Sequence, residues 1–423
     1  MSKKISPDKI EKQEKEYRKY IEEKIQEYNT NGKKTIVHIC DTYYPIIDGV
    51  IKVMENYAVR QVDKYNVILI VPKHKNITTK SDKYLIIGVA SVYFKFVNYD
   101  LAFPSLDKHI AKIVKKIKID LIHTHSAFTM GTFAAKLAKK RNVPMVMTMH
   151  SQYKPDFLRH TNNSELLTNA LLKNIIKVYN KSTEVWTMHQ KVADVLKSYG
   201  YKKDNFYFVP NATDYKKPEN PEYLNDIINE KYNISKDIPV FTYVGRIVIL
   251  KNLLLIIDSL KILNDQSIDF RMFFVGNGPD DQLITAKIKE YHLEDKIIQT
   301  GRIDDRQELS AYYQRAQLFL FPSTYDTSSL VQIEAATYKT PGVFIENTAT
   351  AGTITDKHNG FLSKETAEDF ANTIKEAISN PEKLKEVSEN AHNDLYISWD
   401  DVVKRVVARY EYLIENNTKE NKE

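Results

Sequence analysis

Two basic and two acidic residues in the second half of the chain have the types and spacing expected for binding a phosphorylated sugar. Arg246 and Lys251 lie in GRIVILKN, directly after an apolar run, and Asp326 and Glu334 lie in FLFPSTYDTSSLVQIEAA. Arginine offers a fork to two phosphate oxygens, and lysine supplies a point charge that neutralises a leaving diphosphate. A carboxylate repels a diphosphate, so the two acids are better suited to the hydroxyl groups of a ribose or another sugar. This set predicts a nucleotide-sugar site.

The acidic pair lies on a turn between a predicted strand and a predicted helix. The apolar run 318–321 is typical of a buried parallel strand, and helical spacing runs over 330–338. Ser328 or Ser329 can cap this helix, so that its first backbone N–H groups, around Ser329 and Leu330, point over the carboxyl end of the strand. Because a helix start of this kind attracts anions, we expect the diphosphate at this turn.

Two glycine-containing turns follow other apolar runs in the same half. VGNGP contains Gly276 and Gly278, and TGRIDD covers 300–305. Glycine allows the backbone of a turn to approach a ligand closely, although an ordinary strand-to-helix connection has the same composition. Together with the charged pairs, these turns favour a ligand at the carboxyl ends of parallel strands.

The histidines indicate a functional site less strongly than the charged residues do. His150 directly follows the apolar run MVMTM, and this position at a strand end favours a place in the reaction crevice. We expect structural roles for His123, His125 and His189, because a single histidine is usually structural. No cluster has the spacing of metal ligands, and adjacent aspartate pairs occur where acids cap helices. We therefore expect no metal ion.

The composition indicates an ordinary globular protein. A chain of 423 residues is too long for one core, so two domains are expected. The single cysteine, Cys40, excludes an internal disulfide, and a net charge of +6 does not require a nucleic-acid partner. No secretory signal is visible, and no window offers the run of about 18 apolar residues that a membrane span needs. These features predict a cytoplasmic protein.

Short β-rich runs alternate with helical stretches, which predicts parallel, doubly wound sheets. A polar stretch with three prolines, PNATDYKKPENPEYLNDI, interrupts the alternation and predicts a domain boundary. We expect an α/β fold with two Rossmann-like domains facing across a cleft, residues 34–212 and 213–398, with a C-terminal helix at 399–416 returning to the first domain. The runs predicted as strands are TIVHIC, YNVILIV, YLIIGVA, LIHTH, MVMTMH, EVWTM, FYFVP, VFTYVG, FRMFFVG, KIIQTG, LFLFPS and PGVFIE, and helices are expected in the second domain at about 252–265, 279–291, 307–316 and 329–338.

The first 33 residues are predicted to form a charged helical extension. Apolar and aromatic residues recur in it at roughly helical spacing, which favours packing on the first domain or on a partner. They are Tyr17, Tyr20, Ile21, Ile25 and Tyr28.

A second charged helix is predicted over 106–119, with lysines around an apolar face. It is either an ordinary amphipathic helix with a solvated basic face or a helix that docks to anionic lipid, where each lysine contributes about 1 kcal/mol. The second interpretation places the protein at the inner face of the membrane. The apolar face consists of Leu106, Ile110, Ile113, Val114 and Ile117.

Taken in order and spacing, GRIVILKN, VGNGP, FPSTYDTSSLVQIEAA and PNATD resemble the retaining nucleotide-sugar glycosyltransferases of glycosyltransferase family 4, which have the GT-B fold. The similarity extends from about residue 35 to about residue 413. It implies that Arg246 and Lys251 bind the donor diphosphate, that Glu334 binds the ribose hydroxyls, and that Asp326 contacts the donor sugar.

The resemblance also assigns residues around the nucleoside and on the acceptor side. It implies that Gly276 and Gly278 lie beside the nucleoside and that Arg302 and Ile303 lie next to the base. In the first domain, DTYYPIIDGV resembles the family's glycine-rich first loop, with Gly49 near the donor phosphate or the acceptor. The same comparison implies a place for His150 in the reaction cleft and for His125 near it. Lipid-glycosylating members use a basic helix of the first domain, which favours membrane docking by 106–119.

The chain departs from the family pattern at four places. Asp326 replaces the first of two glutamates, and Ser328-Ser329 replaces a Phe-Gly pair. TATAG, residues 348–352, stands where a Gly-Gly-x-x-Glu stretch is common, and Asp48 stands where a glycine is usual. These changes leave the two basic residues in place and bear on the identity of the sugar.

The leading hypothesis is a retaining glycosyltransferase that moves a hexose from a nucleotide sugar, by family habit a UDP-sugar, to a cell-envelope glycan or glycolipid. No cofactor is required, because the positive charges and helix-start N–H groups stabilise the departing diphosphate. One alternative is a sugar-nucleotide epimerase or another GT-B enzyme. A second alternative is an inactive nucleotide-sugar-binding relic, which the departures from the family pattern motivate.

Overall fold

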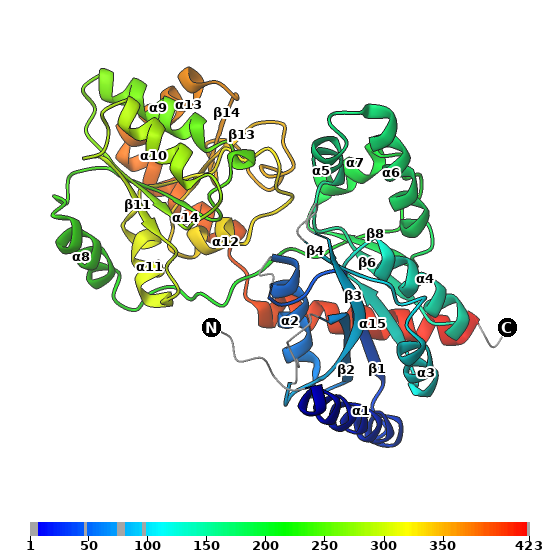
Figure 1. Ribbon diagram of the computed structural model, residues 1–423. Coiled ribbons are helices and arrows are strands. Elements are labelled where there is room, and N and C mark those ends of the chain that lie inside the picture. Colours follow the sequence, from blue (N-terminus) through cyan, green and yellow to red (C-terminus); the bar gives the residue numbers. More distant parts are fainter. Residues whose placement is uncertain (1–6, 46–48, 74–80, 95–98, 421–423) are drawn as a thin grey trace. The chain divides into compact units, whose positions relative to one another are not determined.

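The computed structural model describes residues 7–45, 49–73, 81–94 and 99–420. The chain forms two compact units (Figure 1). The changeover between them at Val209 and Pro210 lies next to the predicted boundary. Residues 188–195, however, belong to unit 2, although the predicted boundary at residue 212 had placed them in the first domain. Unit 1 comprises Met1–Thr187, Leu196–Val209 and Val403–Glu423, and unit 2 comprises Met188–Val195 and Pro210–Val402.

Among the described residues, unit 1 contains an eight-stranded sheet with the order β4-β3-β2-β1-β5-β6-β7-β8. All neighbours are parallel except β3 and β4, which pair antiparallel at one edge. The predicted runs all form strands here, whereas β4 was not predicted. The strands are β1 (Thr35–Ile39), β2 (Asn66–Lys73), β3 (Leu85–Phe94), β4 (Tyr99–Ala102), β5 (Leu121–Thr124), β6 (Met145–Thr148), β7 (Glu184–Thr187) and β8 (Phe206–Phe208).

Helices pack on both faces of this sheet (Figure 1). The last helix, α15, returns from unit 2 and runs along the strands of unit 1. Its Tyr410 is fully buried and hydrogen-bonded to His123, and its Arg409 forms an ion pair with Glu184. The helices are α1 (Pro7–Thr30), α2 (Gly49–Gln61), α3 (Lys108–Lys116), α4 (Thr129–Arg141), α5 (Tyr153–His160), α6 (Glu165–Tyr179), α7 (Gln190–Ser198, shared with unit 2) and α15 (Trp399–Glu420).

The described part of unit 2 contains a six-stranded sheet with the order β11-β10-β9-β12-β13-β14, in which all neighbours are parallel. Five of these strands match the predicted runs, and the short β14 was not predicted. Large apolar side chains such as Phe241, Phe273 and Phe319 are fully buried between the sheet and its helices. The strands are β9 (Val240–Val244), β10 (Arg271–Val275), β11 (Ile297–Gly301), β12 (Leu318–Leu320), β13 (Gly342–Ile345) and β14 (Phe361–Ser363).

The helices of unit 2 follow the predicted positions within two residues where helices were predicted. The four helices between β9 and β13 bring the chain back to the amino ends of the strands, and because all six strands are parallel, their carboxyl ends lie at one edge of the sheet. The helical elements are α8 (Pro221–Tyr232), the 3-10 turn η1 (Ile249–Lys251), α9 (Leu253–Asp265), α10 (Asp281–Glu290), α11 (Arg306–Arg315), α12 (Leu330–Thr337), α13 (Ala367–Ser379) and α14 (Pro381–Leu395).

The N-terminal helix α1 packs on unit 1. Ile21 and Ile25 are buried in the unit 1 core, and the hydroxyl of Tyr17 donates to the carbonyl of Ile86 on β3 at 2.7 Å. Of the two interpretations of this extension, packing on the first domain therefore applies to these residues.

The basic helix α3 starts later than its apolar pattern predicted. Leu106 precedes the helix and is 80% exposed, so the prediction that it belongs to the buried face was wrong. Asp107 is the N-cap, and its carboxylate accepts from the backbone of His109 and Ile110. The remaining predicted apolar residues are buried, and Lys116 pairs with Glu22 of α1 at 2.7 Å. Part of the basic face is thus neutralised by the neighbouring helix.

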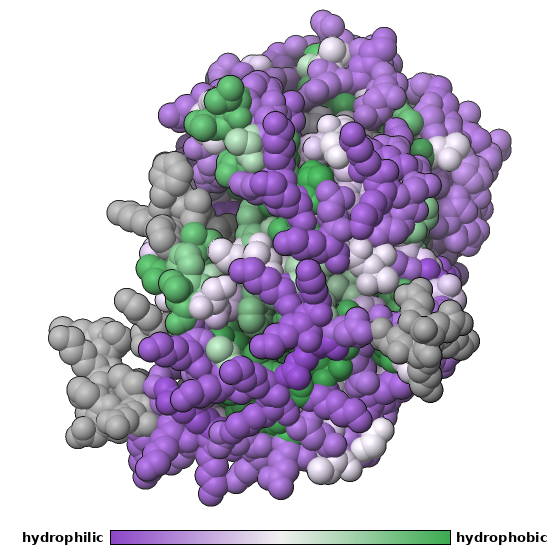
Figure 2. Space-filling view, turned by 90° about the vertical axis from the view of Figure 1, so that its right-hand side faces the viewer, coloured by the Kyte–Doolittle hydropathy of each residue, from purple (hydrophilic) through white to green (hydrophobic). Residues whose placement is uncertain are grey.

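Among the described residues, no helix is long and apolar enough to cross a membrane. The face of the molecule seen in Figure 2 carries mostly hydrophilic side chains, with apolar ones in small groups between them.

Candidate functional site

Three of the predicted strand-end turns meet at the carboxyl edge of the unit 2 sheet. The N–H of Gly245 donates to the carbonyl of Val275 at 3.0 Å, and the N–H of Gly276 donates to the carbonyl of Gly301 at 2.9 Å. Gly276 has a φ of +144°, and a Cβ there would lie 1.9 Å from the Gly245 carbonyl oxygen. A Cβ at Gly278 would be equally close to the Ile247 carbonyl oxygen. Both glycines are therefore required by the approach of the turns to each other, whatever ligand they meet.

Arg246 follows the turn at the end of β9 and is exposed. Its backbone is fixed, because the hydroxyl of Tyr243 donates to the Arg246 carbonyl at 3.0 Å. The guanidinium forms no ion pair with any side chain in the described ranges. It is therefore placed at the carboxyl edge of the sheet with its donors available to an anion.

Lys251 and Asp326, predicted for different parts of the donor, contact each other. Lys251 Nζ lies 2.7 and 2.8 Å from the two carboxylate oxygens of Asp326, and it lies 5.2 Å from the centre of the Phe321 ring. The hydroxyl of Ser323 donates to the same carboxylate at 2.6 Å. The two charged side chains are only 16% and 19% exposed, so this ion pair is shielded from solvent. Lys251 is therefore held in place by Asp326 in the folded protein.

The loop that carries Asp326 is held through three consecutive backbone carbonyls. Thr350 donates its hydroxyl to the Asp326 carbonyl at 2.8 Å, and Asn211 donates its amide to the Ser328 carbonyl at 2.9 Å. His189 Nε2 lies 3.1 Å from the carbonyl between them. TATAG and PNATD thus supply loop contacts, and the structural role expected for His189 is to fix this loop.

Helix α12 begins at Leu330, as predicted, with Ser329 in the N-cap position. The Ser329 side chain makes no capping hydrogen bond, so the prediction that a serine caps the helix was wrong. The first N–H groups of α12 therefore have no partner in the N-cap side chain. They are the groups that a helix start presents to an anion.

Glu334 lies one turn into α12 and is half-buried. The hydroxyl of Tyr313, on α11, donates to its carboxylate at 2.8 Å. Burial, together with this carboxylate, raises the pKa of Tyr313, so the phenol keeps its proton and acts as the donor. Tyr313 therefore orients the carboxylate of Glu334.

Arg302 and Ile303, expected next to the base, follow the end of β11. The guanidinium of Arg302 binds the carboxylate of Asp304 at 2.6 and 2.7 Å on the surface, and Ile303 packs against the unit 2 core. The bridge between Gly276 and Gly301 brings this turn next to the glycine turn after β10.

The remaining predicted site residues belong to unit 1. Gly49 is the first residue of α2, it is exposed, and a Cβ there would meet nothing within 4 Å. Asp48 lies outside the described residues. His150 follows β6 and is partly exposed, and its Nε2 lies 3.0 Å from Nδ1 of His125. Burial lowers the pKa of His150 to about 3. It is therefore neutral at physiological pH.

Unit 1 also brings together three histidines that no local spacing had indicated. His38, His123 and His125 are buried, and one nitrogen of each lies within 4.8 Å of the others. This qualifies the expectation that the chain holds no cluster of metal-ligand type. His38 was not among the predicted site residues, although a histidine inside the apolar run TIVHIC could have indicated a buried polar contact. Tyr313 and Thr350 were also overlooked, because their partners are distant in the sequence.

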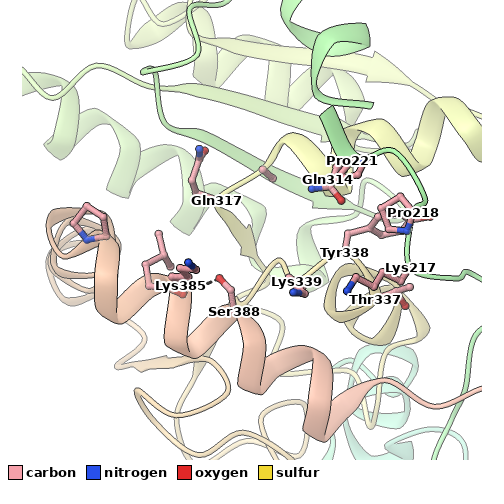
Figure 3. A pocket seen from close by; sticks show the side chains of 13 residues that line it. Lys217, Pro218, Pro221, Gln314, Gln317, Thr337, Tyr338, Lys339, Lys385 and Ser388 are labelled. Atoms are coloured by element: carbon pink, nitrogen blue, oxygen red, sulfur yellow. Dashed lines mark hydrogen bonds between the residues drawn. The ribbon is translucent and has the colours of Figure 1, made fainter. Parts of the chain in front are cut away.

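A pocket of about 400 Å³ lies elsewhere in unit 2. It is lined by Gln317, just before β12, and by Tyr338 and Lys339, just before β13, with Lys385 and Ser388 of α14 opposite (Figure 3). It therefore lies at the amino ends of the strands. The charged residues described above lie at the other edge.

Comparison with known proteins agrees with this arrangement. Residues 47–217 match the family model described as Glycosyltransferase Family 4, and residues 225–394 match the model described as Glycosyl transferases group 1. The chain belongs to glycosyltransferase family 4. The family expected from the sequence motifs is confirmed, and the matched residues cover most of both units.

Named relatives of this glycosyltransferase include two alpha-monoglucosyldiacylglycerol synthases. The one from Streptococcus pneumoniae is 24% identical over 89% of this chain and 86% of its own length. The one from Acholeplasma laidlawii is 28% identical over 74% of this chain and 80% of its own length. The crystal structure of HepE from Anabaena in complex with UDP has a TM-score of 0.73 at 16% identity, and the match covers 90% of this chain and all of that chain. The expected α/β GT-B fold is thereby confirmed.

Proposed function

We propose that this glycosyltransferase retains the anomeric configuration and moves a hexose from a UDP-sugar to a glycolipid or cell-envelope glycan. The observation that carries the proposal is the convergence of Arg246, Lys251 and the start of α12 at the carboxyl edge of the unit 2 sheet. Glu334, oriented by Tyr313, lies on the same helix. This edge offers positive charge for a diphosphate beside a carboxylate for hydroxyl groups.

The reaction follows from where charge develops. The bond between the anomeric carbon and the diphosphate oxygen breaks, which leaves an oxocarbenium-like sugar and a negatively charged diphosphate. The acceptor oxygen bonds to the same face of the anomeric carbon, and its proton passes to the departing phosphate oxygen. Arg246, Lys251 and the N–H groups of α12 stabilise the diphosphate without moving during the reaction. No protein nucleophile and no metal ion are needed in this scheme.

The Lys251–Asp326 ion pair gives the lysine a defined position before the donor binds. A diphosphate oxygen approaching Nζ competes with the carboxylate, so binding requires the ion pair to loosen or to be shared. If Asp326 then accepts a hydrogen bond from a sugar hydroxyl, one movement couples the phosphate contact to the sugar contact. The same ion pair also supports the alternative of an inactive binding protein, in which Lys251 and Asp326 never separate.

The donor and the acceptor are inferred from relatives. HepE was crystallised with UDP, which supports a uridine nucleotide. The two relatives from Streptococcus pneumoniae and Acholeplasma laidlawii are named as glucosyldiacylglycerol synthases, which supports a hexose as the transferred group and a lipid acceptor. A lipid acceptor would require a cytoplasmic enzyme to work at the inner face of the membrane, and the exposed lysines of α3 suit an anionic surface.

The decisive experiment measures sugar release and transfer. UDP-, GDP- and ADP-hexoses are first compared by the rise in melting temperature that each produces, and those that bind are incubated with and without diacylglycerol and glycolipid acceptors. We expect slow release of sugar from a UDP-hexose without acceptor, and faster transfer with a lipid acceptor. Binding without either reaction would replace the proposal by the inactive alternative.

A further inference from the structure

The pocket of about 400 Å³ at the amino ends of the unit 2 strands, which we name the amino-edge pocket, has a positively charged lining (Figure 3). It lies between the segment before α8, the last residues of α11 and α12, and one face of α14. Small-molecule sites have volumes of about 300–1,000 Å³, so the pocket is large enough for a ligand. The described residues that line it include no aspartate or glutamate and three lysines, namely Lys217, Lys339 and Lys385.

Within the described residues, two of these lysines lack an ion pair. Lys339 Nζ is bonded to the carboxylate of Glu389 on α14, and this hydrogen bond lowers the pKa of Glu389. The charge of Lys217 lowers the same pKa further, so Lys217 lies near this carboxylate without bonding to it. Lys217 and Lys385 are exposed, and neither forms an ion pair in the described ranges. Each can therefore bind an anion without giving up a partner.

The rest of the wall is mostly apolar. It includes Pro218 and Pro221 at the start of α8, together with the ring of Tyr338. Binding sites for small molecules combine such walls with a few polar groups that converge on the ligand. A ligand of this pocket therefore needs a carbon framework as well as an anionic group. One face of α14 completes the wall, since its lining residues recur every three or four positions: Pro381, Leu384, Lys385 and Ser388.

A phosphomonoester fits the charge of this pocket better than a carboxylate does. It carries a charge of about −1.5 to −2 at pH 7, which matches the two ammonium groups that lack an ion pair. Lysine binds phosphate as a point charge, whereas bidentate recognition of a flat carboxylate is typical of arginine. In the described part of the chain, no arginine lines the pocket.

The amino-edge pocket adjoins the tyrosine that orients Glu334. Tyr338 lines the pocket, and its ring stacks on that of Tyr313, with the ring centres 5.9 Å apart and the planes 7° apart. The hydroxyl of Tyr338 is also bonded to Ser310 of α11. Tyr313 in turn donates to the carboxylate of Glu334 at 2.8 Å. A ligand that contacts Tyr338 therefore touches a ring whose neighbour holds the carboxylate of the donor site.

We propose that the amino-edge pocket is a second ligand site of this chain, which binds a phosphomonoester and changes the affinity of the donor site through Tyr338 and Tyr313. The coupling rests on the proposed function, because it requires UDP to bind beside Glu334, whereas the site itself does not. Coupling of this kind is reciprocal, so UDP must change the affinity for the ester by the factor by which the ester changes the affinity for UDP. The phosphate group can belong to a soluble metabolite or to a lipid headgroup.

Calorimetric titration of the full-length protein with glycerol 3-phosphate and a hexose 6-phosphate tests the site. Inorganic phosphate is the comparison without a carbon framework, and we expect it to bind more weakly than the esters. Lys217→Ala/Lys385→Ala removes two charge-assisted hydrogen bonds and should weaken ester binding about tenfold or more. Lys216→Ala/Lys289→Ala, at two exposed lysines of unit 2 outside the lining, is the matched control and should bind the ester normally.

Two further arms separate this site from the other anion-binding surfaces of the chain. Arg246→Ala removes a cation of the donor site only, so ester binding should persist in it. Flotation with phosphatidate vesicles, compared between the unmodified protein and Lys217→Ala/Lys385→Ala, shows whether the phosphate of a lipid reaches the same lysines. A loss of flotation in this variant would identify the lipid as the source of the phosphomonoester.

The coupling is measured as the affinity for UDP with and without saturating ester. We expect a change of about fivefold or more, and the same factor for the ester with and without UDP. The inference is overturned if neither the esters nor phosphatidate binds, if binding persists in Lys217→Ala/Lys385→Ala, or if ester and UDP bind independently. Ester binding at these lysines in a protein without affinity for UDP would overturn the proposed function and the coupling, but not the site.

Discussion

At the scale of single residues, the donor site depends on two cations with different surroundings. Arg246 is exposed and lies on a turn fixed by Tyr243, whereas Lys251 is shielded and held by Asp326. The guanidinium can therefore meet a diphosphate at once, but the ammonium must exchange or share a carboxylate. Removal of either cation should weaken nucleotide binding, and removal of Lys251 should also affect folding stability.

We expect Arg246→Ala and Lys251→Ala each to abolish most of the rise in melting temperature that UDP produces. A charge-assisted hydrogen bond contributes about 1.5–3 kcal/mol, so the affinity for UDP should fall about tenfold or more. The shift must be measured from each variant's own ligand-free melting temperature, because Lys251→Ala leaves a shielded carboxylate without its cation. Lys289→Ala, at an exposed lysine of α10, is the matched control. An undiminished shift in both variants would contradict the diphosphate assignment.

Asp326 should tolerate glutamate better than asparagine. Asp326→Asn removes the charge that holds Lys251 and should lower the free energy of unfolding by about 1–3 kcal/mol, together with turnover. Asp326→Glu keeps the charge and should retain more of both. Urea unfolding and the rate of sugar transfer measure the two effects. Equal activity in the two variants would reduce Asp326 to an ordinary loop acid.

Chelation of divalent ions should leave transfer largely intact. The scheme assigns the charge of the leaving diphosphate to Arg246, Lys251 and the start of α12, so a metal ion would have no part in it. Initial rates with and without EDTA give the measurement. If EDTA abolished the reaction and one divalent ion restored it, this part of the proposal would be wrong.

At the scale of elements, the donor site is formed by the carboxyl ends of strands and by one restrained loop. Gly245 and Gly276 allow neighbouring turns to come together, and the loop before α12 is tied down through the carbonyls of residues 326–328. Carbonyls that point toward the interior leave the loop little freedom to slide along the sheet. This accounts for the polar TATAG stretch, because Thr350 supplies one of the three donors.

The basic helix α3 offers an element-scale prediction about membranes. Lys112 and Lys115 are exposed, whereas Lys116 is paired with α1. We expect Lys112→Glu/Lys115→Glu to reduce flotation with anionic liposomes, since each lysine near the surface contributes about 1 kcal/mol. Lys289→Glu/Lys364→Glu changes the net charge equally on unit 2 and should have little effect.

Added salt should weaken the binding of the unmodified protein to anionic liposomes. Equal recovery with neutral and anionic liposomes would instead indicate a soluble acceptor.

At the scale of the whole molecule, the return of α15 to unit 1 completes a core that contains an unusual number of neutral histidines. Tyr410 covers His123, which stacks on His125 at a ring separation of 4.2 Å. His38, from β1, lies beside both rings. Folding therefore removes several titratable groups from water in their uncharged form.

Unfolding at pH 6 should consequently take up protons. The pKa values of His38, His123, His125 and His150 are all lowered by burial, so the folded protein keeps these rings neutral while the unfolded chain protonates them. With an unfolded pKa of about 6.5, these four groups should bind about three protons on unfolding at pH 6. Stability should therefore fall as the pH is lowered from about 7 toward 5.

Calorimetric unfolding in buffers with different ionisation enthalpies measures this uptake. No dependence on the buffer would show that the four rings are already charged in the folded protein.

The sequence by itself determined the types of the functional residues and their places at strand ends. Arg246, Asp326 and Glu334 could be singled out because apolar runs, glycines and helical spacing are local patterns, and the four motifs in order were enough to indicate the family. Most strands could be recognised as apolar runs, but β4 and β14 were missed because they are short and lie at the edges of their sheets.

Only the tertiary structure decided which of these residues meet. Lys251 and Asp326 are 75 residues apart, and nothing local indicates that the assigned partners of phosphate and sugar neutralise each other. His38 and His123 became neighbours because β1 and β5 pair in register, although 85 positions separate them in the chain. Such contacts depend on strand order and register, which follow from the packing of the whole sheet and are not written in any short segment.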